Sequence, residues 1–378
     1  MKKSLSSFTI AATYVGTVVG AGFASGQEVL QFFGFFGIWG LIGIAIATAL
    51  FIFFGNVIMQ IGHNLGARSH EPVIRQVGGR GISSIIDWTI TFFLFGVVVT
   101  MAAGSGAIFV EQFGRPAFWG SLLMVVLPAI TVLLGVNRVI ESISLVAPIL
   151  LLSVLSLGLW TVFSNFAGFT GNLSLFNTAG AAVPNWPASA VLYVSYNIVL
   201  AVAVLAPLGA LSRPENIRSG AVLGGLGLGL GVLAIASAII ALAPRVGGLE
   251  VPMIAIAGGV SPLVRTLYSI VLIAEVYTTA VAGLYGFAAR LAEPESRNYK
   301  LLTVGTAAGG FVLAQFGFST LVGTLFPAVG FAGLLLLGAL TYYYFRPSLA
   351  EGRWFQPGPA RKPDAHNEKR KNEEERKK

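Results

Sequence analysis

Long apolar stretches, separated by short polar segments, repeat along almost the whole chain. A helix needs roughly 20 apolar residues to cross a bilayer, and ten stretches reach or approach that length. They cover residues 8–36, 38–61, 85–110, 117–136, 139–163, 187–211, 217–243, 262–290, 300–316 and 320–345. The pattern predicts an all-α polytopic membrane protein with about ten transmembrane helices.

Composition supports this class and excludes several functions. Of the 378 residues, 55% are hydrophobic and 11% are charged, which is too apolar for a soluble protein of this size. Cysteine is absent and the three histidines are scattered, so we expect no disulfide and no metal site. The sequence has no Gly-rich nucleotide-phosphate loop and no HExxH motif. We therefore expect neither an enzyme nor an ATP-driven pump, and no cofactor other than a coupling ion.

The placement of lysine and arginine predicts the orientation in the membrane. If the N-terminus is cytoplasmic, 21 of the 24 Lys and Arg residues fall in cytoplasmic segments, as the positive-inside rule requires. The others, Arg115, Arg245 and Arg265, fall in outer segments. We expect a multi-pass protein of the cell (cytoplasmic) membrane with both termini in the cytoplasm. The net charge of +8 then reflects orientation in the lipid bilayer and not a nucleic-acid partner.

Ten spans divide into two sets of five that start on opposite sides of the membrane, which is the condition for an inverted repeat. The predicted parts are a first five-helix repeat (1–163), an extracellular loop (164–186), a second five-helix repeat (187–345) and a charged cytoplasmic tail (346–378). The repeat is inferred from topology alone, because the two halves show no similarity residue by residue.

The first stretch, Phe8 to Phe36, is apolar but has a centre that forms a helix poorly. Gly16, Gly20, Gly22 and Gly26 lie close together there, and each glycine costs about 1 kcal/mol relative to alanine inside a helix. A break would leave backbone groups unpaired, which a membrane tolerates only where they line a cavity or bind something. The stretch is typical of a discontinuous helix in a secondary transporter. A Gly-rich helix packed closely against its neighbours is an equal alternative.

The eighth stretch carries a carboxylate near its middle. Glu275 lies where an ionised carboxylate costs several kcal/mol unless it faces a cavity, pairs or stays protonated. Thr278 and Thr279 follow on the same helical face. These side chains predict a cation site or a proton site. The alternative is a protonated glutamate beside threonines that bond to their own helix.

Further polar groups interrupt two apolar stretches. Glu28 follows the glycine cluster, where it either lines an outer vestibule or stands near the lipid headgroups. Ser195, Tyr196 and Asn197 place three polar groups in a row within the sixth stretch, and Pro207 removes a backbone donor further on.

The segment TYVGTVVGAGFASGQEVLQFF of the first stretch resembles the start of the YkvI-type bacterial membrane proteins. The resemblance covers about residues 5–345. It implies the amino acid–polyamine–organocation superfamily and a LeuT-like fold, which is a 5+5 inverted repeat with discontinuous helices 1 and 6. Members of that superfamily are mostly cation-coupled carriers of amino acids and related small solutes. The sixth stretch departs from the pattern because it has no glycine cluster.

The resemblance also implies an ion site. In sodium-coupled relatives, main-chain carbonyls at the helix 1 break and two hydroxyls of helix 8 hold one ion. The matching positions here are Gly16 and Val19 for the carbonyls, and Thr278 and Thr279 for the hydroxyls. Glu275, one turn earlier, departs from the usual small residue. This departure makes a proton an alternative to sodium as the coupling ion.

The same resemblance implies a substrate site. A substrate carboxylate would meet the free amides of Gly20, Ala21 and Gly22, and the substrate amino group would face helix 6 near Ser195 and Asn197. Among these polar neighbours we also expect Tyr196 to contact the substrate.

Two functions from different classes remain open. The first is a sodium- or proton-coupled symporter for an amino acid or similar small organic solute. It would work by alternating access, with the first and sixth stretches moving against a scaffold that includes the third and eighth. The second is a ligand-sensing membrane subunit with a transporter fold and no net transport, for which spore-germination receptor subunits of the superfamily are a precedent. A sensor would need a protein partner, and the sequence identifies none.

Overall fold

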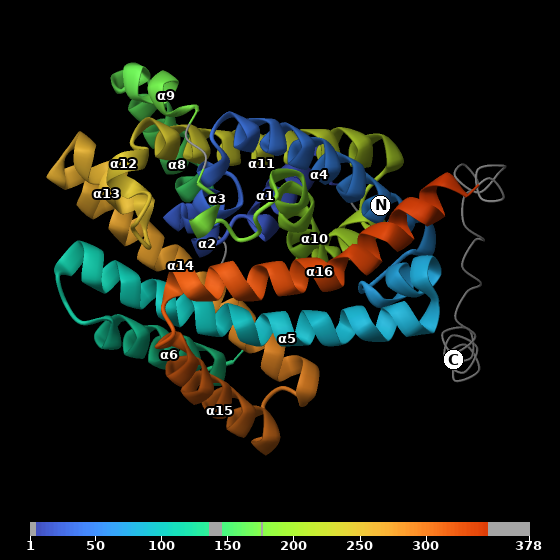
Figure 1. Cartoon of the computed structure of the whole chain (residues 1–378). Helices are drawn as coiled ribbons and strands as arrows, with labels where there is room; N and C mark the ends of the chain where they lie inside the picture. The colour runs from blue at the N-terminus through green and yellow to red at the C-terminus, as the bar shows by residue number, and fades with distance from the viewer. Residues whose placement is uncertain (1–4, 136–145, 175–176, 347–378) are drawn as a thin grey trace, which may run out of the picture.

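The computed structural model describes residues 5–135, 146–174 and 177–346, and the chain is helical through nearly all of them (Figure 1). The longer helices are α1 (Ser7–Val18), α4 (Ile38–Leu65), α5 (Glu71–Phe113), α6 (Ala117–Leu133), α8 (Val146–Ser164), α10 (Trp186–Ala210), α11 (Pro214–Ala241), α14 (Pro262–Leu291), α15 (Arg297–Ala314) and α16 (Phe318–Phe345). The shorter elements are α2 (Ala21–Ser25), α3 (Gln27–Phe32), α9 (Phe166–Asn172), α12 (Ala243–Val246), α13 (Pro252–Val260) and the 3-10 helices η1 (Gly34–Phe36) and η2 (Thr178–Gly180). Within these ranges no strand forms, which confirms the predicted all-α class.

The described helices include six that are long and apolar enough to cross a membrane, namely α4, α5, α10, α11, α14 and α16. The pair α8–α9, bent by 87°, adds a seventh if it counts as one span. Helices α1 and α6 are apolar but shorter. Each of the ten predicted stretches is mostly helical where it is described, but ten complete crossings and the inverted repeat stay predictions. Residues 139–145 of the fifth stretch, the N-terminal lysines and the tail after Arg346 lie outside the described residues.

The helices form two packed groups that meet along the middle of the molecule. Helix α4 packs on α10 and α11, and α1 packs on α11 and α10. Helix α5 packs on α6, α14, α15 and α16, and Figure 1 shows α5 and α16 running side by side. Helix α16 also packs on α10, so it joins the two groups.

Glycines bring α4 and α10 into close contact. A Cβ added to Gly62 would lie 2.2 Å from the Ala206 carbonyl oxygen, and one added to Gly209 would lie 2.0 Å from the Met59 carbonyl oxygen. No side chain fits at either position, so the two backbones touch. Such contacts hold helices together in a bilayer, where lipid removes the usual hydrophobic drive between helices.

The sixth predicted stretch forms the unbroken helix α10, so the expectation of a discontinuous helix 6 was wrong. Between Trp186 and Leu208 the sequence has no glycine, and the internal Pro207 lies in the last turn. A proline there removes one helical hydrogen bond but leaves the earlier turns intact. The fold therefore has its break in the first stretch and a continuous helix in the sixth.

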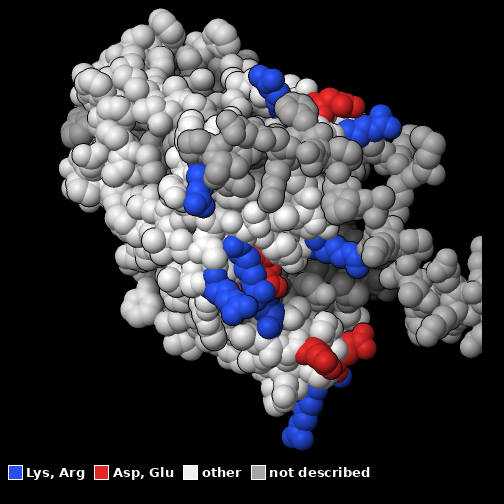
Figure 2. Space-filling model, turned by 90° about the vertical axis from the view of Figure 1, so that its right-hand side faces the viewer, with Lys and Arg blue, Asp and Glu red and all other residues white. Residues whose placement is uncertain are grey.

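Positive charge gathers at one end of the helix bundle. The N-terminal end of α1 and the C-terminal end of α16 lie at the right in Figure 1. Figure 2 shows several Lys and Arg side chains on the surface of this end. The junctions α4–α5 and α10–α11, with Arg68 and Arg213, belong to it. The α5–α6 junction, which holds Arg115, lies at the opposite end. The charge asymmetry predicted from the sequence is thus present along the bundle axis.

Candidate functional site

The first stretch is broken, as its glycines predicted. Helix α1 ends at Val18, and Val19 (φ −71°, ψ 114°) and Gly20 (φ −135°, ψ −171°) are extended before α2 begins. A second interruption follows at Gly26, whose φ of 83° is a left-handed conformation that glycine adopts without strain. Because a helix end leaves its last carbonyls and first amides without intrahelical partners, this break exposes backbone polar groups in the middle of the bundle.

A cavity of about 570 Å³, here called the central cavity, lies against this break. Helices α1, α2, α3, α5, α10, α14 and α16 contribute to its wall. With the exception of Ser195, every residue predicted for the site lines it: Gly16, Val19, Gly20, Ala21, Gly22, Glu28, Tyr196, Asn197, Glu275, Thr278 and Thr279. Segments that are far apart in the sequence therefore meet at one cavity.

Glu28 lies at the break itself. Its side chain is 7% exposed, and its Oε2 accepts a hydrogen bond of 2.6 Å from the Tyr196 hydroxyl. A Cβ added to Gly22 would fall 1.7 Å from Glu28 Oε1, so the carboxylate rests directly on the glycine backbone. The sequence left Glu28 between an outer vestibule and the headgroups. In the structure Glu28 lines the central cavity. Its place in an outer vestibule stays a prediction.

Tyr196 belongs to a cluster of three aromatic rings in the wall of the same cavity. The ring centroids of Phe93, Tyr196 and Phe326 lie 5.0 to 5.9 Å from one another, and all three residues line the central cavity. Nothing in the sequence marks Phe93 and Phe326 as site residues, since single phenylalanines in apolar helices carry no distinguishing pattern. Only the packing of α5 and α16 against α10 brings them to the site.

The polar face of α14 points to the break. Glu275 is 4% exposed, and its Oε2 has no hydrogen-bond partner in the described structure. The Thr279 side chain interacts with this carboxylate, and its Oγ1 would lie 3.8 Å from a Cβ added to Gly20. The Thr278 hydroxyl donates to the Glu275 carbonyl oxygen at 3.0 Å. Helix α14 thus presents one unpaired carboxylate oxygen and two hydroxyl oxygens beside the end of α1.

The three polar neighbours in α10 point in different directions. The Ser195 hydroxyl donates to the Gly330 carbonyl oxygen at 2.7 Å and does not line the central cavity. The geometry therefore gives its predicted contact with the substrate no support, because consecutive helical residues face different sides. Asn197 lines the cavity, and its amide nitrogen donates to the Tyr193 carbonyl oxygen at 2.9 Å.

An ion pair lies at the far end of the central cavity. Arg290 lines the cavity and lies fifteen residues after Glu275 on α14. At a helix rise of 1.5 Å per residue, the two positions are about 22 Å apart. Its guanidinium lies 2.5 Å from Asp87 Oδ1 and donates to the Thr91 hydroxyl at 2.9 Å. His70 Nε2 lies 3.0 Å from the same Asp87 oxygen. The cavity therefore runs from the break toward the arginine-rich end of the bundle, where its arginine is already paired.

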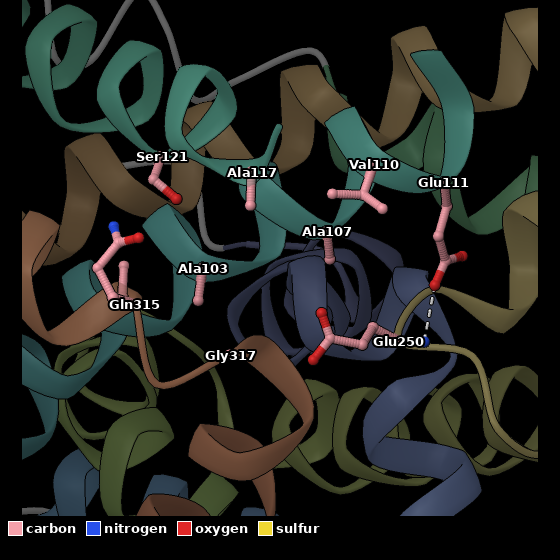
Figure 3. A pocket seen from close by; sticks show the side chains of 10 residues that line it. Ala103, Ala107, Val110, Glu111, Ala117, Ser121, Glu250, Gln315 and Gly317 are labelled. Carbon is pink, nitrogen blue, oxygen red and sulfur yellow. Dashed lines mark hydrogen bonds between the residues drawn. The ribbon is translucent and has the colours of Figure 1, made fainter. Parts of the chain in front are cut away.

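A second cavity, of about 180 Å³, lies toward the opposite end and contains two carboxylates (Figure 3). Glu111 Oε1 accepts hydrogen bonds from the amides of Glu250 (2.8 Å) and Val251 (3.2 Å), which precede α13. Glu250 Oε1 in turn accepts from the Ser319 amide of α16 at 3.1 Å. These bonds, here called the outer contact, tie the α13 segment to α5 and α16. They lie beyond the end of the central cavity that holds Glu28.

Comparison with known proteins identifies the family. No family model matches the chain. The membrane protein YkvI of Bacillus subtilis (strain 168) is 31% identical over 336 residues, which are 88% of this chain and 94% of that protein. The chain belongs to the YkvI family of membrane proteins. The protein YyaD of the same organism, 29% identical over 330 residues (87% of this chain and 94% of YyaD), is similar to this YkvI-family chain as well.

Solved structures show the fold of this YkvI-family chain. The inward-facing conformation of Mhp1 matches 91% of the chain and 77% of its own length, with a TM-score of 0.58 and 16% identity. MhsT in complex with L-phenylalanine matches 91% of this chain and 93% of its own length, with a TM-score of 0.61 and 15% identity. A Na⁺-coupled sialic acid symporter matches 89% of this chain and 79% of its own length, with a TM-score of 0.59 and 13% identity. At this identity the match shows the fold alone, which is that of the LeuT-fold transporters.

Proposed function

We propose that this protein is a secondary active transporter, a cation-coupled symporter that moves an amino acid or related small organic solute by alternating access. The observation that carries the proposal is the broken first helix, whose unpaired backbone lines a central cavity together with two buried carboxylates. Transporters place substrate and ion sites at such breaks. The protein would then belong to the amino acid–polyamine–organocation superfamily.

We assign the coupling ion to the space between the end of α1 and α14. The carbonyls of Gly16 and Val19 and the hydroxyls of Thr278 and Thr279 would supply oxygen ligands for sodium, and all four residues line the central cavity. Glu275, buried with one unpaired oxygen beside them, would carry a coupling proton or assist the cation. Either role explains a carboxylate in a position where burial is costly.

We assign the solute to the region between the break and α10. The backbone of Gly20, Ala21 and Gly22 would contact it on one side, and Tyr196 and Asn197 on the other. A cavity of about 570 Å³ lies within the range of roughly 300–1,000 Å³ that small-molecule sites occupy.

The access cycle would move α1 to α3 and α10 against a scaffold that includes α5 and α14. With both termini cytoplasmic, the arginine-rich end faces the cytoplasm, and the central cavity would open inward while the outer contact is closed. Opening of the outer contact and closure around Arg290 would complete the cycle.

A flux assay tests the proposal. The purified full-length chain would be reconstituted into liposomes, and uptake of labelled amino acids and amines would be measured under sodium and proton gradients. We expect gradient-driven accumulation of at least one solute that also raises the unfolding midpoint of the purified protein. A ligand at 100 times its Kd adds about 2.7 kcal/mol to stability. Persistent binding without flux would favour the sensor and refute the transporter.

A further inference from the structure

The charges that line the central cavity are unequally distributed. Near the break the cavity wall has two carboxylates, Glu28 and Glu275. No described lysine or arginine lines this part of the cavity. The arginine that does line the cavity, Arg290, stands at the other end and is paired with Asp87. Buried carboxylates without a positive partner are unfavourable. A ligand at the break would therefore be favoured if it brought positive charge.

Glu28 lies against the backbone that a ligand carboxylate was expected to meet. Its Oε1 rests against Gly22, since a Cβ there would be only 1.7 Å away, and its Oε2 accepts from Tyr196. The backbone of Gly22 was expected to meet the carboxylate of an amino acid. A second carboxylate beside Glu28 would be repelled across a short distance in a poorly solvated site. The chain thus supplies its own carboxylate at this position.

The walls beside Glu28 suit the apolar substituents of a cation. The rings of Phe93, Tyr196 and Phe326 contact one another and line the same cavity. Aromatic faces attract ammonium groups, and this attraction strengthens when the site is desolvated. Glu275 adds an independent sign of a missing partner, because its Oε2 is buried without any hydrogen bond in the described residues.

We propose that the ligand of the central cavity is an organic ammonium ion without a carboxylate, that is, an amine or quaternary amine with an apolar body. Glu28 neutralises the ammonium group, and the three rings cover the carbon atoms attached to it. The inference rests on the proposed function and specifies its solute. Among amino acids and related small organic solutes, it favours amines. Zwitterionic amino acids are disfavoured because their carboxylate meets Glu28.

Matched ligands test this on the unmodified protein. Binding to the full-length chain in detergent would be measured by calorimetry for phenethylamine, phenylalanine and 3-phenylpropanoate, and for isopentylamine, leucine and 4-methylpentanoate. Within each set we expect the amine to bind at least tenfold more tightly than the amino acid, and the acid to show no saturable binding. An amino acid that binds as tightly as its amine, or the failure of both amines to bind, overturns the inference.

A charge-removing variant tests the role of Glu28. Glu28→Gln keeps the shape but removes the charge, so amine affinity should fall at least tenfold while the preference over amino acids shrinks. The control Glu215→Gln, in the exposed first turn of α11, should leave both unchanged. If a folded Glu28→Gln protein binds amines as tightly as the parent chain does, the inference is refuted. If that variant fails to fold, the ranking on the unmodified protein decides alone.

Flux separates this inference from the function on which it rests. Amines that bind in the expected order but are not moved across liposome membranes would leave the ligand class standing and refute transport. Uptake that requires the carboxylate of an amino acid would leave transport standing and refute the ammonium ligand.

Discussion

The Tyr196 hydroxyl donates a hydrogen bond of 2.6 Å to the Glu28 carboxylate and so joins α10 to α3 at the central cavity. Both side chains are buried, Tyr196 at 2% and Glu28 at 7% exposure. In a poorly solvated site such a bond is costly to lose, because the acceptor is left without a partner. The bond therefore links the broken first helix to the continuous α10 at the cavity wall.

Replacement of Tyr196 by phenylalanine tests this bond. The ring and its aromatic contacts remain, but Glu28 loses its donor, so the free energy of unfolding should fall by about 1.5–3 kcal/mol. The measurement is the unfolding midpoint in detergent. Tyr193→Phe on the same helix is the control, because no hydrogen bond of its hydroxyl to a described residue is seen. Equal midpoints for the two variants would show that the bond contributes nothing to stability.

Gly22→Ala tests the contact between the glycine backbone and Glu28. The added Cβ would overlap Glu28 Oε1, so the carboxylate must move, at a cost of about 1–3 kcal/mol for overpacking. Ligand affinity should fall with it. Gly305→Ala is the control, since nothing lies within 4 Å of its added Cβ in α15. There alanine should stabilise the helix by up to about 1 kcal/mol. A Gly22→Ala protein with unaltered stability and binding would contradict the geometry.

Much of this site follows from the sequence because its signals are local. The four glycines of the first stretch favour a break, although the Gly-rich α11 stays continuous, and a glutamate with threonines at i+3 and i+4 shares a helical face by geometry alone. The break and the carboxylate of α14 were found in this way.

Other parts depend on how helices face one another, which no local pattern records. Ser195 and Asn197 look equivalent in the sequence, but one turns to Gly330 and the other to the cavity. Glu28 follows the glycine cluster in the sequence, and this position predicted a place in the outer half of the first stretch. The turn at Gly26 folds its carboxylate back to Gly22. Phe326 gave no signal at all.

Glu275→Gln tests the coupling site. Glutamine keeps the shape and polarity of the side chain but cannot bind and release a proton. If Glu275 carries the coupling proton, uptake into liposomes should lose its dependence on pH while ligand binding persists. The measurement is initial uptake rate across a series of pH values, with Glu215→Gln as the control for loss of a surface charge. An unchanged pH profile would show that Glu275 does not carry the coupling proton and would leave sodium, beside Thr278 and Thr279, as the coupling ion.

The outer contact should set the balance between inward-open and outward-open states. Glu111 accepts two backbone amides of the α13 segment, and Glu111→Ala removes both bonds. Each bond to a charged group contributes about 1.5–3 kcal/mol, and 1.4 kcal/mol is about tenfold in an equilibrium. The variant should therefore populate the outward-open state at least several-fold more.

Thiol labelling measures that shift without background, because the chain contains no cysteine. Ala203→Cys places a thiol in the wall of the central cavity. In inside-out vesicles a membrane-impermeant maleimide should label it quickly in the parent chain and several-fold more slowly with Glu111→Ala. Arg115→Ala, an exposed change at the same end of the bundle, should not alter the rate. If Ala203→Cys is labelled at the same rate with and without Glu111→Ala, the outer contact does not hold the outer side closed.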